Sequence, residues 1–262
     1  MSKNRVLCRS HDWLIALLMS ACAAGLSPLA AAADVLEESR EVSGFHALSA
    51  SISGRISLSR GAEEGLLIEA KPETLERIIT EVEHGVLRIR QKSASGWWRD
   101  SGPVRIRISY RELDELDMSG SADVTTDALS AESFRIGISG SSNIEVPALT
   151  ADSLSVRVSG SGDLDVGELT ADEVEVVVSG SGDVQLAGRA TALAVKVNGS
   201  GNVDSEDLEV TSAEVAVSGS GDVSVWVRDE LDVRISGSGN VAYRGEPEVE
   251  RRISGSGDLE PR

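Results

Sequence analysis

The chain has 262 residues and a formal net charge of −18, from 43 acidic and 25 basic side chains. An acidic excess of this size argues against nucleic acid and anionic membrane surfaces as partners. Aromatic residues make up only 3% of the sequence and glycine occurs 26 times, which excludes a large aromatic core and indicates stacked aliphatic layers.

The first 33 residues have the pattern of an export signal. A basic stretch with Lys3, Arg5 and Arg9 precedes an apolar segment over residues 13–29, and three alanines then end at Ala33. This order is typical of a secretory signal peptide, for which we expect cleavage after Ala33. The sequence therefore predicts a protein exported to the periplasm, or to the outer membrane or cell surface, of a bacterium.

Both cysteines, Cys8 and Cys22, lie inside this segment. Cleavage after Ala33 leaves a chain without cysteine, so we expect an exported protein without disulfides, thiol catalysis or a zinc–thiolate site. An alternative is lipidation of Cys22, because residues 19–22 (Met-Ser-Ala-Cys) are similar to a bacterial lipoprotein box. In this interpretation the lipid would attach the protein to a membrane, and we expect no other membrane contact.

Residues 34–118 are less regular than the rest of the chain. Residues 46–58 look like a degenerate copy of the repeat described below, and residues 66–70 and 104–110 read as strands. An uncapped stack of strands would expose open edges. We therefore expect residues 34–118 to form a β region that caps the stack.

A short helical turn and a hairpin are expected inside this cap. Apolar residues near 74–78 follow helical spacing, with Thr74 as a candidate N-cap. Two strand-like runs then flank His84-Gly85, which predicts a hairpin there.

A loop over residues 93–103 contains two adjacent tryptophans, Trp97 and Trp98. In a loop rich in Gly and Ser, they would form an exposed platform for a sugar or protein partner. Alternatively, they fold back over an edge of the cap. These two residues are the candidate binding residues of the chain.

Eight near-copies of one short phrase run through residues 119–262. Successive copies begin 20, 20, 20, 19, 20, 18 and 18 residues apart. A period this regular is typical of a solenoid in which each repeat is one structural unit. The copies are SGSADV, SGSSNI, SGSGDL, SGSGDV, NGSGNV, SGSGDV, SGSGNV and SGSGDL, which begin at Ser119, Ser139, Ser159, Ser179, Asn198, Ser218, Ser236 and Ser254.

Each repeat predicts two short strands joined by a tight corner. Val156 and Val158 alternate with polar residues before one such corner, and Leu164 and Val166 do so after it. The same positions are aliphatic in the other repeats, so equivalent residues should stack on parallel strands of successive coils. We therefore expect an all-β protein, a right-handed parallel β-helix with about 20 residues per coil.

The residue types of the corner phrase predict its backbone conformation and its hydrogen bonds. Glycine at the second position, as at Gly160, is expected to supply a positive φ. The serine hydroxyls and the following Asp or Asn are expected to bond local backbone groups. Asp and Asn recur in one column, and carboxylates of that column, at Asp163, Asp183 and Asp222, are alternative calcium ligands.

The sequence carries no nucleophile elbow, phosphate-binding glycine loop or zinc signature. We therefore predict a non-enzymatic β-solenoid without a cofactor, which binds or scaffolds an unknown envelope protein or glycan. Oligomers are expected to form through the solenoid ends. One alternative is a carbohydrate-active β-helix enzyme, against which the uniform, nearly loop-free repeats argue. The other is a calcium-stabilised structural rod.

Three segments carry a family resemblance: FHALSASISGRISL from Phe45, TEVEHGVLRI from Thr80 and LDMSGSADV from Leu116. Together they resemble the head GIN domain family, the putative autotransporter adhesin head domains, over roughly residues 43–259. The resemblance implies a β-helical protein of the cell envelope or a secreted one, and it suggests adhesion. It supplies no catalytic residues.

Overall fold

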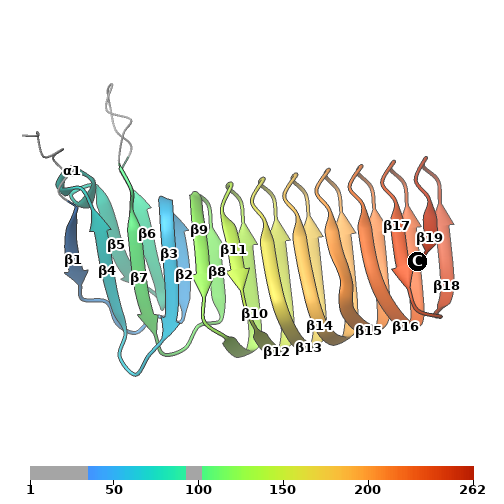
Figure 1. The fold of residues 1–262 in the computed structure, drawn as a ribbon, viewed down its shortest axis with the longest axis horizontal. Helices are drawn as coiled ribbons and strands as arrows, with labels where there is room; N and C mark the ends of the chain where they lie inside the picture. The colour runs from blue at the N-terminus through green and yellow to red at the C-terminus, as the bar shows by residue number, and fades with distance from the viewer. Residues whose placement is uncertain (1–34, 93–101) are drawn as a thin grey trace, which may run out of the picture. The chain divides into compact units, whose positions relative to one another are not determined.

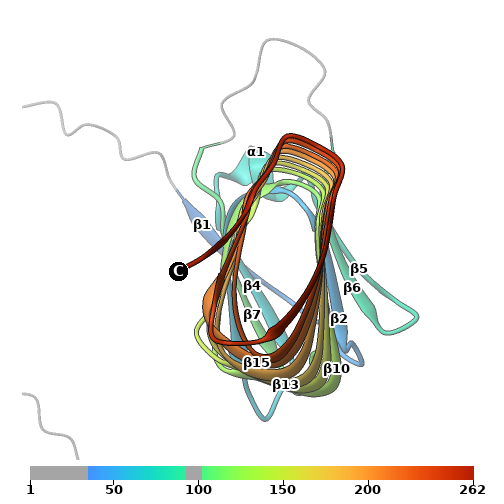
Figure 2. The same ribbon diagram turned by 90° about the vertical axis from the view of Figure 1, so that its right-hand side faces the viewer.

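Short strands stacked in successive coils make up almost all of the described chain (Figure 1). The computed structural model describes residues 35–92 and 102–262, which belong to one unit, Ala33–Arg262. Within these residues, 19 strands are hydrogen-bonded into one continuous sheet that winds around a closed core (Figure 2). The strands are β1 (Leu36–Arg40), β2 (Ala47–Ser51), β3 (Ser53–Arg60), β4 (Gly65–Ala70), β5 (Ile78–Glu83), β6 (Val86–Gln91), β7 (Arg105–Tyr110), β8 (Glu115–Met118), β9 (Ser121–Thr126), β10 (Leu129–Ile138), β11 (Asn143–Val146), β12 (Leu149–Val158), β13 (Leu164–Val178), β14 (Val184–Val197), β15 (Val203–Val217), β16 (Val223–Ile235), β17 (Val241–Arg244), β18 (Glu248–Ile253) and β19 (Leu259–Pro261).

Residues one repeat apart face each other across parallel strands. Ile136 pairs with Val156, and Val156 pairs in turn with Val176. After the corner, Ile144 pairs with Leu164 in the same way. The predicted parallel β-solenoid, with coils about 20 residues apart, is therefore confirmed.

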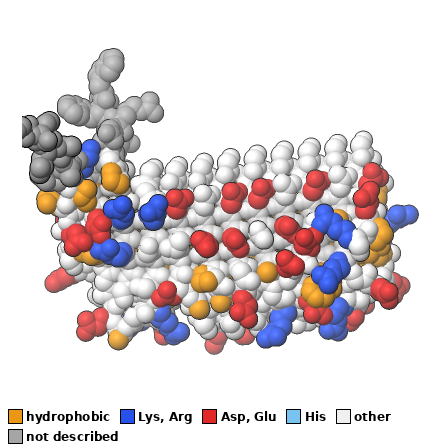
Figure 3. All heavy atoms as spheres, in the orientation of Figure 1, with side chains coloured by type: hydrophobic (Ala, Val, Ile, Leu, Met, Phe, Trp, Pro, Cys, Tyr) orange, Lys and Arg blue, Asp and Glu red, His pale blue; other side chains and the backbone are white. Residues whose placement is uncertain are grey.

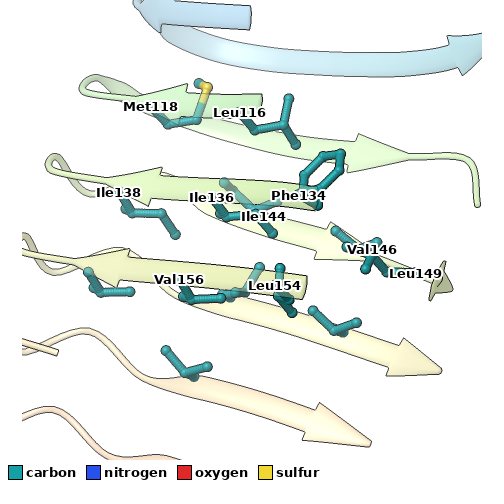
Figure 4. Packing of buried hydrophobic residues seen from close by; sticks show 14 of the residues in the cluster. Leu116, Met118, Phe134, Ile136, Ile138, Ile144, Val146, Leu149, Leu154 and Val156 are labelled. Carbon is teal, nitrogen blue, oxygen red and sulfur yellow. The ribbon is translucent and has the colours of Figure 1, made fainter. Parts of the chain in front are cut away.

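The aliphatic columns form the core. Ile136, Val156 and Val176 are each 0% exposed, and Figure 4 shows Ile136 and Ile144 directed into the same interior from facing strands. Full burial of one such side chain contributes roughly 1.5–3 kcal/mol. Every coil adds several of these residues, so apolar stacking holds the array together without a disulfide.

The corner glycines are required for a different reason from the expected one. A Cβ added at Gly180 would overlap the carbonyl oxygen of Gly160 in the preceding coil. The close approach of adjacent backbones therefore excludes a side chain, and the expectation of a positive φ is wrong. Among the described glycines, positive φ values occur only outside the second position of the repeated phrase, at Gly44, Gly54, Gly85, Gly102, Gly188 and Gly245.

The irregular N-terminal part continues the same solenoid. In the degenerate coil, Ala50 of β2 pairs with Met118 of β8, and Ser53 of β3 pairs with Ser121 of β9. On their other edge, β2 pairs with β6 and β3 pairs with β7. Beyond β7, β4 and β1 add antiparallel strands that end the parallel stacking.

The helical turn is shifted from its expected position. The helix α1 spans Pro72–Leu75, its N-cap is Lys71, and Pro72 stands at its start. Thr74, the expected N-cap, is buried inside the helix, so that prediction is wrong. Proline has φ fixed near the helical value, which explains the earlier start.

The hairpin expected at His84-Gly85 is present between β5 and β6. Both turn residues have positive φ, 53° at His84 and 80° at Gly85, as a two-residue hairpin of the I′ type requires.

No helix among the described residues is long and apolar enough to span a membrane.

Candidate binding surface

A shortened coil interrupts the regular array. The copies that begin at Ser179 and Asn198 are 19 residues apart, whereas the three steps before them are 20. In β14 of this coil, Gly188 pairs with Leu169 of β13 and Leu208 of β15. The coil therefore lacks a side chain where both neighbours have leucine. A Cβ at Gly188 would overlap the Leu169 backbone, so only glycine fits this close approach.

Small residues continue on the outer side of β14. Ala194 pairs with Glu175 of β13 and Glu214 of β15, and Ala192 pairs with Glu173. Long carboxylate side chains thus stand on both sides of short ones. The result is a groove of about 910 Å³ across β12–β16 and β18, which we call the β14 groove. Its acidic lining residues are Glu173, Glu175, Glu214, Glu230, Asp232, Glu248 and Glu250.

Part of this negative charge is neutralised by arginines of the next outward column. Arg157 lies 3.2 Å from Glu175. Arg234 pairs with Glu214 and lies 2.6 Å from Asp232. The hydrogen bond to Glu214 and the charge of Asp232 raise the pKa of Arg234, so this guanidinium stays charged and paired.

Three other carboxylates of the groove form no ion pair with any residue that the structure describes. They are Glu173, Glu230 and Glu248, and strand pairing places them in one outward column along the solenoid. Ala192 and Ser212 occupy the two positions between Glu173 and Glu230. The groove thus has a row of free negative charge on one side and a row of paired charge on the other.

The Asp/Asn column after the corner forms a hydrogen-bonded ladder. Asp163 Oδ1 accepts a hydrogen bond from the Asp183 backbone N–H, at 2.8 Å. Asp183 Oδ1 accepts one from Asn202 (2.8 Å), and Asn202 Oδ1 accepts one from Asp222 (2.9 Å). Each side chain therefore bonds the next coil, where a local backbone partner was expected. The ladder joins coils at their outer surface, as the core joins them inside.

The alternative calcium ligands Asp163, Asp183 and Asp222 are all members of this ladder. Figure 3 shows rows of acidic side chains along the solenoid beside its corner turns. Within residues 35–92 and 102–262, no group of three or more His, Cys, Asp or Glu side chains is arranged to hold a metal ion. Calcium binding at this column stays a prediction.

The other residues singled out from the sequence lie outside the described residues. These are the tryptophans Trp97 and Trp98, the cleavage site at Ala33 and the lipidation candidate Cys22. The groove, in contrast, was not predicted. Its signal in the sequence is the pair of small residues Ala192 and Ala194, at positions where the neighbouring coil has Glu173 and Glu175.

His46 should make the stability of the first coil depend on pH. Its Nδ1 lies 3.0 Å from the Asp114 carboxylate, and this hydrogen bond, followed by the charge of Asp114, raises the pKa of His46 above 6.5. The resulting stabilisation is complete below the unfolded-state pKa and is lost as the pH rises through the folded-state pKa. Between about pH 5.5 and about pH 9, the urea midpoint of the wild type should therefore fall by more than that of His46→Gln. Parallel curves for the two proteins would contradict this role of the pair.

The sequence matches the family model described as "Putative auto-transporter adhesin, head GIN domain" over residues 44–167 and 148–247. Among curated proteins, none matches the chain. Several solved structures share the fold. Their sequence identities to this chain are too low to indicate its function. These comparisons show which kind of protein the chain is similar to.

One similar structure is that of a putative lipid binding protein from Parabacteroides distasonis, with a TM-score of 0.81 and 24% identity over 87% of this chain and 97% of the other. A putative adhesin from Parabacteroides merdae gives a TM-score of 0.80 and 21% identity, over 87% and 96%. A putative adhesin from Bacteroides fragilis gives 0.68 and 21%, over 87% and 97%. The family match spans most of the sequence, so the chain belongs to the family of putative auto-transporter adhesin head GIN domains.

Proposed function

We propose that this protein is an exported, non-enzymatic binding module of the bacterial cell envelope, which holds an envelope protein or glycan on the flank of its solenoid. The observation that carries the proposal is the β14 groove, where small side chains of β14 lie between carboxylates of the neighbouring coils. Natural proteins depart from their own regular sequence and packing patterns mostly at functional sites. The adhesin description of the family supports the same class of function.

Two further features support binding over catalysis. The coils are joined by tight corners such as Ser159–Leu164, so among residues 35–92 and 102–262 no long loop lies beside the groove to carry reacting groups. The groove carboxylates that form no ion pair with a described residue, Glu173, Glu230 and Glu248, are all exposed to solvent, as a binding surface for a charged partner requires.

The proposal is tested by finding the cell fraction that contains the native protein and by identifying its mature N-terminus. The full chain, with a C-terminal tag, is expressed in its host, and the cell fractions are analysed by mass spectrometry of the mature N-terminus. An N-terminus at Asp34 in a soluble envelope fraction supports export by the signal route, and a lipidated Cys22 supports the anchored route. An uncleaved chain in the cytoplasm would overturn the proposal.

The tryptophan pair supplies a second arm of this experiment. If Trp97 and Trp98 form a platform for a sugar or protein, Trp98→Ala should reduce retention of the purified protein on host envelope material and leave its melting temperature unchanged. A glycan array of the same two proteins identifies the class of partner. Equal retention of both proteins would remove the pair from the binding surface.

A further inference from the structure

We infer that the β14 groove binds an extended peptide segment that carries two basic side chains four residues apart. The inference deepens the proposed function and rests on it, because it names the chemistry of the partner for that surface. Three properties of the groove lead to it: the position of its free charge, the distance between those charges, and the low floor between them.

The partner should carry positive charge, because the repeat array is strongly acidic. Residues 119–262 hold 26 acidic and 10 basic side chains, so most of the chain's net charge of −18 lies here. Inside the groove, Glu173 and Glu230 remain without an ion pair to any described residue. Opposite them runs the column of Arg157 and Arg234, which are already paired. A ligand cation is therefore attracted to the Glu173 side and repelled from the other, which fixes its position across the groove.

The spacing of Glu173 and Glu230, two of the three carboxylates in this column without an ion pair to a described residue, selects an extended chain. Glu173 and Glu230 are three coil steps apart in one column, or roughly 14 Å at the usual distance between strands. In an extended peptide, residues i and i+4 lie on the same face and are about 13–14 Å apart. Residues i and i+3 point to opposite faces, so a change in spacing of one residue would separate the two charges.

The floor between the carboxylates leaves room for the peptide. Ala192 and Ser212 occupy the two intervening positions of the column, and Ala194 lies beside them in β14. The groove crosses β12–β16 and β18, a length of about 24 Å, which is about seven extended residues. A small residue at i+2 can then contact Ala192, since the side chains at i, i+2 and i+4 share one face.

The test uses the full mature protein and a labelled nine-residue peptide with Lys at positions 3 and 7, Ala at 5, and Gly or Ser elsewhere. Fluorescence anisotropy measures its affinity at low ionic strength, where charge contacts are least screened. We expect Glu173→Gln with Glu230→Gln to weaken binding at least about tenfold, the effect of about 1.4 kcal/mol. The control is Glu145→Gln with Asp165→Asn, which removes the same charge from exposed positions of β11 and β13 outside the groove.

A second pair of measurements separates the groove from general attraction to an acidic rod. A peptide with Lys at positions 3 and 6 should bind more weakly than the first, and Ala194→Trp, which fills the exposed floor, should abolish binding with an unchanged melting temperature. The inference is overturned if both peptides bind alike, or if the control variant loses as much affinity as the groove variant. Should the wild type then still bind host envelope material, the proposed function stands with a different partner. Loss of both kinds of binding refutes both.

Discussion

Gly180→Ala should destabilise the array by about 3 kcal/mol, at the upper end for one added methyl group in a packed region. The new Cβ would overlap the carbonyl oxygen of Gly160, and it would also lie 2.9 Å from the Gly160 carbonyl carbon. Both atoms are backbone, so neither can rotate away as a side chain would. The two coils must separate locally and lose hydrogen bonds such as Ser181 N–H to Gly160 O, now 2.9 Å. Urea unfolding followed by circular dichroism measures the change.

The matched control is Gly65→Ala at the start of β4. A Cβ at Gly65 meets no atom within 4 Å, and its φ lies outside the positive range. Alanine there should change stability by less than about 1 kcal/mol, because only the freedom of the unfolded chain differs. If the two variants unfold at the same urea concentration, the close approach of coils does not explain the corner glycines.

Asp183→Ala should cost about 1–2 kcal/mol by breaking the surface ladder. Asp183 Oδ1 accepts hydrogen bonds from both the backbone N–H and the side-chain Nδ2 of Asn202, at 2.8 and 3.0 Å. Alanine leaves both donors to water at the edge of the sheet. Asp183→Asn retains an acceptor oxygen in the same place and removes a carboxylate next to Asp163. The asparagine variant should therefore be at least as stable as the wild type.

The same two variants test the calcium alternative. If the column binds calcium through Asp163, Asp183 and Asp222, a chelator should lower the melting temperature of the wild type, and Asp183→Asn should abolish that effect. If the column is only a ladder, chelator and calcium leave all three melting temperatures unchanged. A ligand that binds only the folded state must raise its stability, so the two outcomes cannot be confused.

The architecture was predictable because the period of the repeat sets which residues of neighbouring strands pair. Once Val156 and Val176 are recognised as one column, the pairing of neighbouring strands follows without further information, and the structure confirms it. The N-terminal strands were also predictable from alternation. Their arrangement was not, because β4–β7 interrupt the sequence between β3 and β8 but lie on the far side of β2 and β3, which pair directly with β8 and β9. That contact links residues about 70 positions apart.

The candidate binding surface was not predictable in the same way. Its origin is a set of small side chains, such as Ala192 and Ala194, between long carboxylate side chains of neighbouring coils, and a search for the repeat pattern treats such variation at outward positions as noise. Likewise, the corner glycines were assigned to the right place for the wrong reason. Their constraint comes from the neighbouring coil, which a single repeat does not contain. Sequence reasoning succeeded where the repeat period determines the outcome, as in the pairing of Val156 with Val176, and failed where the distance between neighbouring backbones determines it.

The ladder has a consequence for how such a chain can change over time. Each rung takes its acceptor from the coil before and offers its own to the coil after, so duplication of a 20-residue unit creates a coil that fits at once between its parents. Rod length is therefore free to drift by unequal recombination. The coils between Glu173 and Glu230 are the exception, because an added coil there would lengthen the distance between these two carboxylates. A coil added outside β13–β16 leaves that distance unchanged, so the rod can lengthen there without separating Glu173 from Glu230.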